Sequence, residues 1–253
     1  MSYQERYKNN IWKYYLASIL GGFAFFYNAI DTLYYRHWGL SFEQVGWLLG
    51  ASMATSLILE IPTGAFADLY GKKKSILIAS LFNLLGISCL AFGSSFPIFL
   101  LGFVFWGVST AFNSGAGNAW LYDSLKATGD EKTLTKHLGR LSSAFISVDI
   151  LSSVIAPLLF ALNVRLPYFV SFIAMIVVIL IQASMFEKVI KSVVSEWGLI
   201  KENFYQMRDS LGLVKNNRFF TLSGLYKKSV AENKINTLKI PNTIVLLTLF
   251  LRK

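Results

Sequence analysis

Long apolar runs alternate with short polar connections between residues 11 and 186. A helix that crosses the hydrocarbon core of a bilayer needs about 20 largely apolar residues. Six runs have this length, and each is too long for a β-strand: Ile11–Tyr34, Val45–Phe66, Ser75–Gly93, Pro97–Leu121, Leu141–Leu162 and Pro167–Phe186. Because a backbone in lipid must satisfy its hydrogen bonds within its own segment, the pattern predicts an all-α membrane protein. Its first domain, residues 1–187, is a bundle of six transmembrane helices.

Residues 188–217 follow a different pattern. Apolar side chains recur there at alternating spacings of four and three: Val193, Trp197, Ile200, Phe204, Met207, Leu211 and Val214. This periodicity predicts an amphipathic helix. We expect it to be a cytoplasmic linker that either lies along the membrane surface or packs on the ends of the bundle.

The last segment, residues 218–253, begins like a seventh span at Arg218–Tyr226, but Lys227 and Lys228 interrupt it. The apolar stretch Ile240–Leu251 is only about half the length of a span. We therefore expect residues 218–253 to be a truncated or aberrant start of a second half.

The basic residues indicate the orientation of the bundle. Sixteen Lys and Arg residues lie on one side: Arg6, Lys8, Lys13, Lys72, Lys73, Lys74, Lys126, Lys132, Lys136, Arg140, Lys188, Lys191, Lys201, Arg208, Lys215 and Arg218. The connections on the other side carry only Arg36 and Arg165. Since cytoplasmic loops carry the excess of basic residues, the N-terminus is predicted to be cytoplasmic and the protein to be a multi-pass protein of the cell membrane.

Composition supports a lipid environment. Only 15% of the 253 residues are charged and 54% are hydrophobic, whereas soluble domains carry about 25% charged residues. The net charge of +10 does not indicate nucleic-acid binding, because the basic residues lie at the ends of apolar runs. No Walker loop, dinucleotide fingerprint, zinc-binding His pair or nucleophile elbow occurs. We expect no enzyme activity, no cofactor and no metal site.

The connection between the second and third runs carries the most informative motif. It reads Gly64-Ala-Phe-Ala-Asp68-Leu-Tyr-Gly71-Lys72-Lys73-Lys74. Gly64 and Gly71 allow close helix approach and a sharp reversal. Asp68 is expected at a helix N-terminus, where the macrodipole favours an anion, and the lysines hold the loop at the cytoplasmic face.

This loop resembles the signature loop of the major facilitator superfamily, and the resemblance extends over about residues 11–226. The preceding Glu60-Ile61-Pro62-Thr63-Gly64 is similar to bacterial drug-efflux members. Leu69 departs from the family, which usually has a basic residue there. The resemblance implies that Asp68 contacts a C-terminal half and controls opening of the cytoplasmic side. We expect most of that half to be absent from this chain, that is, a transporter truncated after its N-terminal six helices.

Two further helices resemble the family. In the fifth run, Ser143, Ser152, Ala156 and Pro157 resemble the antiporter motif of drug exporters, with Ser and Ala in place of glycine; ordinary helix packing with a proline kink is the alternative. The fourth run resembles its counterpart through Gly107 and the end Ser114-Gly115 to Asp123. Phe103 stands where many proton-coupled exporters have arginine.

Polar residues inside apolar spans are costly and are functional candidates. Asp31, with Asn28 and Tyr35 at helical spacing, and Asp149 are candidates for binding protons or substrate; interhelical pairing or interfacial exposure is the alternative. Asn113, Gly117 and Trp120 share one face of the fourth helix and could line a cavity. Glu60, Asp123 and Arg140 are expected to form a charge network at the cytoplasmic end.

The leading hypothesis is a secondary transporter that works by alternating access, with its substrate near the midplane. By resemblance, it exports a small amphipathic or drug-like molecule against protons, and Asp31 or Asp149 carries the proton. The expected partners are the lipid bilayer, a small-molecule substrate, protons, and a second half or a second copy. The alternative is a non-transporting six-helix remnant that is inactive without a partner half.

Overall fold

The computed structural model describes residues 3–187, and the predicted linker and seventh segment lie outside this range. Within it, six helical spans are long and apolar enough to cross a membrane, which confirms the six predicted runs. They are Glu5–His37, Phe42–Tyr70, Lys72–Phe92, Phe96–Thr128, Glu131–Leu162 and Leu166–Ala183.

Two of the spans are interrupted, although the sequence predicted continuous helices. The first span consists of α1 (Tyr3–Phe23), the 3-10 turn η1 (Phe26–Ile30) and α2 (Asp31–His37). The fourth consists of α5 (Phe96–Asn113) and α6 (Ala116–Thr128). Gly115 separates α5 from α6 with a φ of 74°, a conformation that favours glycine.

The other spans are single helices. The second is α3 (Phe42–Tyr70), the third α4 (Lys72–Phe92) and the sixth α8 (Leu166–Ala183). The fifth, α7 (Leu134–Leu162), follows the short turn η2 (Glu131–Thr133) and starts seven residues before the predicted run. Pro157 lies inside α7 without ending it.

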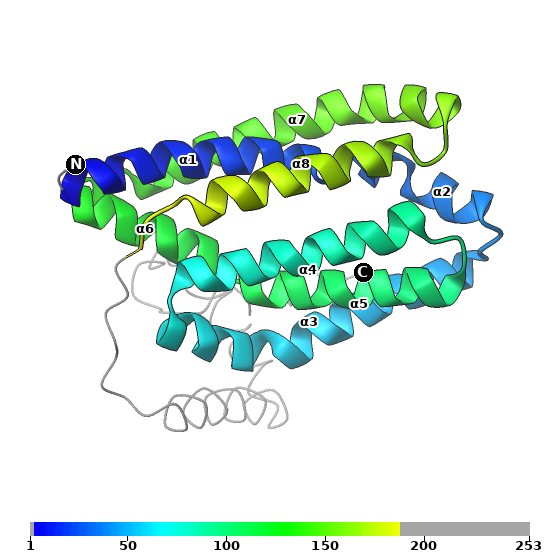
Figure 1. Cartoon of the computed structure of the whole chain (residues 1–253), viewed down its shortest axis with the longest axis horizontal. Coiled ribbons are helices and arrows are strands. Elements are labelled where there is room, and N and C mark those ends of the chain that lie inside the picture. Colours follow the sequence, from blue (N-terminus) through cyan, green and yellow to red (C-terminus); the bar gives the residue numbers. More distant parts are fainter. Residues whose placement is uncertain (1–2, 188–253) are drawn as a thin grey trace, which may run out of the picture. The chain divides into compact units, whose positions relative to one another are not determined.

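The helices pack in a consistent spatial order. α3 lies against α5, α5 against α4, α4 against α8, and α8 against α1, which also contacts α6 and α7. Figure 1 shows α1, α7 and α8 side by side in one group and α3, α4 and α5 in the other. α4 and α8 therefore join the two groups.

Small residues let the helices approach closely, as expected in lipid, where association depends on van der Waals packing. A Cβ atom added at Gly107 of α5 would lie 2.5 Å from the carbonyl oxygen of Ser52 on α3. One added at Gly86 of α4 would lie 2.9 Å from the carbonyl oxygen of Gly102 on α5. These glycines fix the backbone contacts that hold α3, α4 and α5 together.

Candidate functional site

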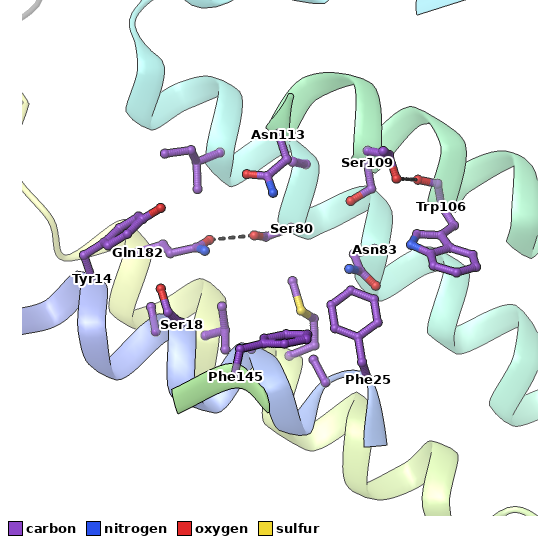
Figure 2. Close-up of a pocket in the computed structure, with 18 of the residues that line it drawn as sticks. Tyr14, Ser18, Phe25, Ser80, Asn83, Trp106, Ser109, Asn113, Phe145 and Gln182 are labelled. Carbon is purple, nitrogen blue, oxygen red and sulfur yellow. Dashed lines mark hydrogen bonds between the residues drawn. The ribbon is translucent and has the colours of Figure 1, made fainter. Parts of the chain in front are cut away.

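A cavity of about 440 Å³ lies between α1, α4, α5, α7 and α8. Figure 2 shows its walls. Its lining consists of apolar, aromatic and neutral polar side chains: Tyr14, Ala17, Ser18, Gly21, Ala24, Phe25, Ile76, Ala79, Ser80, Asn83, Trp106, Ser109, Thr110, Asn113, Ser114, Phe145, Met175, Val178 and Gln182. No Asp, Glu, Lys or Arg of the described residues is among them.

One wall is fixed by an interhelical hydrogen bond. The hydroxyl of Ser80 on α4 donates to Oε1 of Gln182 on α8 at 2.7 Å. Asn83 lies one turn further along α4, and its side chain is only 8% exposed. Its amide has no hydrogen-bond partner among the residues that the structure describes, and Figure 2 shows it facing the cavity. Asn83 therefore offers free donors and an acceptor to a ligand.

Asn113, Gly117 and Trp120 were predicted to line a cavity from one face of the fourth span, and only Asn113 does so. Trp120 is buried and does not line it; instead, its ring stacks on that of Tyr14, with 5.4 Å between centroids. The break at Gly115 separates the two residues, so they no longer share a helical face. Gly117 makes room for Tyr14, since a Cβ there would lie 2.9 Å from the phenolic oxygen.

Aromatic side chains occupy another part of the cavity. The ring of Phe25 lies 6.4 Å from that of Trp106 and 6.4 Å from that of Phe145. Figure 2 shows these three rings apart from the Ser80–Gln182 pair and Tyr14. Asn83 and Ser109 lie beside Phe25 and Trp106 in the same view, so polar and aromatic side chains are interleaved in the lining.

Asp31 lies outside this cavity, at the start of α2. Its Oδ1 accepts hydrogen bonds from the hydroxyl of Tyr168 on α8 at 2.8 Å and from that of Tyr35 at 3.3 Å. Asp31 therefore joins the first and sixth spans, which is the interhelical pairing considered as one alternative. The predicted companion Tyr35 does contact Asp31, whereas Asn28 is exposed on η1 and takes no part.

Asp149 is exposed on α7 and has no hydrogen bond or ion pair within residues 3–187. Its position corresponds to the second alternative, exposure rather than pairing. The structure does not pair Asp149 with Asp31, whose carboxylate bonds Tyr168 and Tyr35.

The loop around Asp68 is shorter than the sequence suggested. α3 continues through Tyr70, and Gly71, with a φ of 100°, is the only residue before α4 begins at Lys72. Asp68 therefore lies exposed in the last turn of α3, and its predicted place at a helix N-terminus is wrong. Gly64 is half-buried, with no atom within 4 Å of an added Cβ.

Glu187 caps α4 instead. Its two carboxylate oxygens accept hydrogen bonds from the backbone N–H groups of Lys72 and Lys73, both at 2.9 Å. These N–H groups have no partner within the helix, and a carboxylate satisfies them while meeting the positive end of the helix dipole. Glu187 follows α8, so the cap ties the sixth span to the third.

Further contacts hold the segment after α8 against the start of the first and third spans. The ammonium of Lys73 donates to the carbonyl oxygens of Ala183 and Met185. That of Lys13 donates to the carbonyl of Ser184 at 2.7 Å. The side chain of Asn10 bonds the backbone N–H and carbonyl of Phe186. Residues 183–187 are thus held by α1 and α4 together.

The predicted network of Glu60, Asp123 and Arg140 does not form among the described residues. Asp123 instead forms an ion pair with Lys72 of the loop. Glu60 accepts a hydrogen bond from the hydroxyl of Ser114 at 3.3 Å. Arg140 is exposed on α7 and pairs with neither carboxylate. Lys74 is exposed next to the paired Lys72 and Lys73.

Comparison with known proteins agrees with this geometry. A sequence profile of the Major Facilitator Superfamily matches residues 14–228, which is most of the chain. The chain belongs to the major facilitator superfamily. This is a family of transporters rather than enzymes, and six spans over residues 3–187 are consistent with one half of such a transporter.

One curated relative is the uncharacterized MFS-type transporter YxaM of Bacillus subtilis (strain 168). It is 30% identical over 157 residues, a match that covers 61% of this chain and 38% of the relative. The chain therefore spans less than two-fifths of the length of the superfamily member that it matches.

The residues resembling the superfamily's antiporter motif divide into two groups. Ser152 and Ala156 are buried on the same face of α7 as Val148, which packs against Gly22 of α1 with 3.0 Å to an added Cβ. Ser143 is exposed and bonds its own helix at Gly139, and Pro157 is also exposed. The buried pair lies where ordinary helix packing would place it.

Several residues of the site were missed from the sequence. Asn83 and Gln182 lie within apolar runs, and polar residues there are a signal of function that could have found them. Tyr14 and Trp106 carry no such signal, because aromatic residues are common in these spans. Glu187 could not be found, since its cap joins residues more than one hundred positions apart.

Proposed function

We propose that this protein is a secondary transporter that works by alternating access and binds its substrate in the cavity between α1, α4, α5, α7 and α8. The observation that carries the proposal is the polar-lined cavity in a chain of the major facilitator superfamily. The amides of Asn83 and Asn113 line this space without a hydrogen-bond partner among residues 3–187, so they are accessible to a ligand.

The exposed end of the bundle around Asp68 supports the same mechanism. Asp68 makes no contact within residues 3–187, so it is available to a second half or a second copy. The N-terminus, the connection between α3 and α4, and the end of α8 lie at this same end (Figure 1). We propose that the protein lies in the cell membrane with this end facing the cytoplasm.

We further propose proton-coupled export of a small amphipathic molecule, with Asp31 as the proton carrier. Asp31 is half-buried between the first and sixth spans, and a carboxylate in apolar surroundings can exist in both protonation states. Its Oδ1 accepts both tyrosine hydroxyls, which leaves Oδ2 without a partner among the described residues. Asp149 is exposed and has no hydrogen-bond partner among the described residues, so it lacks the half-buried surroundings of Asp31.

The test is flux in vesicles that contain the purified protein under an imposed pH gradient. The probes are ethidium, a cation, and methylumbelliferyl glucoside, an uncharged glycoside. We expect gradient-driven flux of a probe that Asp31→Asn abolishes and Asp149→Asn retains. Flux that ignores both the gradient and Asp31→Asn would contradict proton coupling, and no flux of any probe would favour the non-transporting remnant.

A further inference from the structure

We infer that the cavity binds an uncharged amphipathic molecule, whose hydroxyl or amide groups bond the unpaired polar side chains of the lining and whose apolar ring packs on its aromatic side chains. The inference rests on the proposed function, because it names the substrate class of the same cavity. It narrows the expected drug-like molecule to one without a net charge.

The first argument is the absence of charge in the lining. A charged ligand that leaves water needs an opposite charge or a dense set of hydrogen bonds in its site. The described lining offers no carboxylate for a cation and no ammonium or guanidinium for an anion. Glu60 accepts the hydroxyl of the lining residue Ser114, but it is exposed and is not itself part of the wall.

The second argument is the set of unpaired polar groups. Asn83 and Ser109 are 8% and 6% exposed, and neither side chain has a hydrogen-bond partner within residues 3–187. Both side chains line the cavity, so their unpaired polar groups are accessible to the hydrogen-bonding groups of a ligand. Asn113 adds a second free amide (Figure 2). Each amide both donates and accepts, which matches hydroxyl and amide groups.

The third argument is the set of aromatic side chains in the lining. Phe25, Trp106 and Phe145 surround one part of the cavity with ring faces and edges. Such rings favour contact with a flat or cyclic apolar group. Asn83 and Ser109 lie beside Phe25 and Trp106 (Figure 2), so a ligand whose ring packs on these side chains also reaches the unpaired polar groups.

Three glycosides that share one ring system but differ in charge test the inference. They are methylumbelliferyl glucoside, which is uncharged, the glucosaminide, which is a cation, and the glucuronide, which is an anion. Binding to the purified full chain in nanodiscs is followed by energy transfer from tryptophan to the umbelliferyl group, with Trp106→Phe identifying the cavity signal. We expect the glucoside to bind at least about tenfold more tightly than either charged analogue.

A charge placed at Asn83 should reverse this preference. Asn83→Asp is nearly the same size and should favour the glucosaminide over the glucoside by about tenfold. Asn118→Asp is the matched control, because Asn118 is exposed on α6 and does not line the cavity. The preference should stay unchanged in this control.

The inference is overturned if the wild-type chain binds a charged analogue most tightly, if the glucoside does not bind, or if Asn83→Asp leaves the preference unchanged. Failure of the proposed function looks different. Selective binding of the glucoside without gradient-driven flux would refute transport and leave the binding preference standing. Gradient-driven flux of ethidium without binding of the glucoside would support transport and overturn the binding preference.

Discussion

The carboxylate of Glu187 accepts a hydrogen bond from the backbone N–H of Lys73 at 2.9 Å, across 114 residues of sequence. With the second bond to Lys72, it gives α4 the N-terminal cap that its own sequence lacks. Gly71 precedes α4, and no side chain of the loop caps it. A residue that follows the sixth span therefore caps the first turn of the third span.

Glu187→Ala should therefore lower the stability of the bundle. Loss of an N-terminal cap costs about 1 kcal/mol, because two N–H groups lose their acceptor. Thermal unfolding in detergent measures the effect, and Glu187→Gln should lose less than Glu187→Ala because it keeps one acceptor oxygen. Glu131→Ala is the control, because the carboxylate of Glu131 in η2 has no hydrogen bond or ion pair within residues 3–187. Equal losses of stability in both Ala variants would refute the capping role.

Asp68→Asn should leave the unfolding temperature unchanged, because Asp68 is exposed and makes no contact in the described part of the chain. Under the proposed function it should nevertheless reduce gradient-driven flux, since the carboxylate is available to a second half. By contrast, Asp123→Asn removes the ion pair with Lys72. It should lower the free energy of unfolding by up to about 1 kcal/mol. A fall in unfolding temperature for Asp68→Asn would show that Asp68 has a structural contact.

Gly107→Ala should destabilise the packing of α3 on α5. The added Cβ would lie 2.5 Å from the carbonyl oxygen of Ser52 and 2.7 Å from Cβ of Thr55, so the helices must separate. Overpacking of this kind costs on the order of 1–3 kcal/mol. Gly50→Ala is the control, because no atom lies within 4 Å of its added Cβ. Equal unfolding temperatures for the two variants would contradict the observed helix contact.

Ser152→Ala should preserve or raise stability. Its hydroxyl is buried with no hydrogen-bond partner, and removing such a group relieves a desolvation cost, here by up to about 1 kcal/mol. Ser153→Ala, whose exposed hydroxyl bonds the carbonyl of Ile150 at 2.7 Å, should change little. If Ser152→Ala keeps stability but abolishes flux, the hydroxyl serves transport rather than packing.

The sequence was sufficient for the number and type of the spans, because lipid demands about 20 apolar residues in a helix whatever the tertiary contacts. It was less informative where the backbone departs from a helix. Gly115 and η1 interrupt spans that are apolar over most of their length, and the periodicity of Ile11–Tyr34 does not indicate the interruption.

The candidate site was predicted only where a residue type carries its own signal. Asp31 was found because a carboxylate in an apolar run is costly, and its neighbour Tyr35 followed from helical spacing. Tyr168, from a span more than one hundred residues away, could not be found in this way. Lys72 was expected to hold a loop at the membrane surface, yet its pairing with Asp123 depends on how α4 and α6 cross.

Gly71 is the whole connection between a helix of 29 residues and one of 21. Because the connection is only one residue long, we expect a displacement of the exposed end of α3 to move the first turn of α4 as well. That same helix carries Ala79, Ser80 and Asn83 in the cavity wall. Under the proposed function, a displacement at Asp68 would therefore reach the cavity wall through the joined helices α3 and α4.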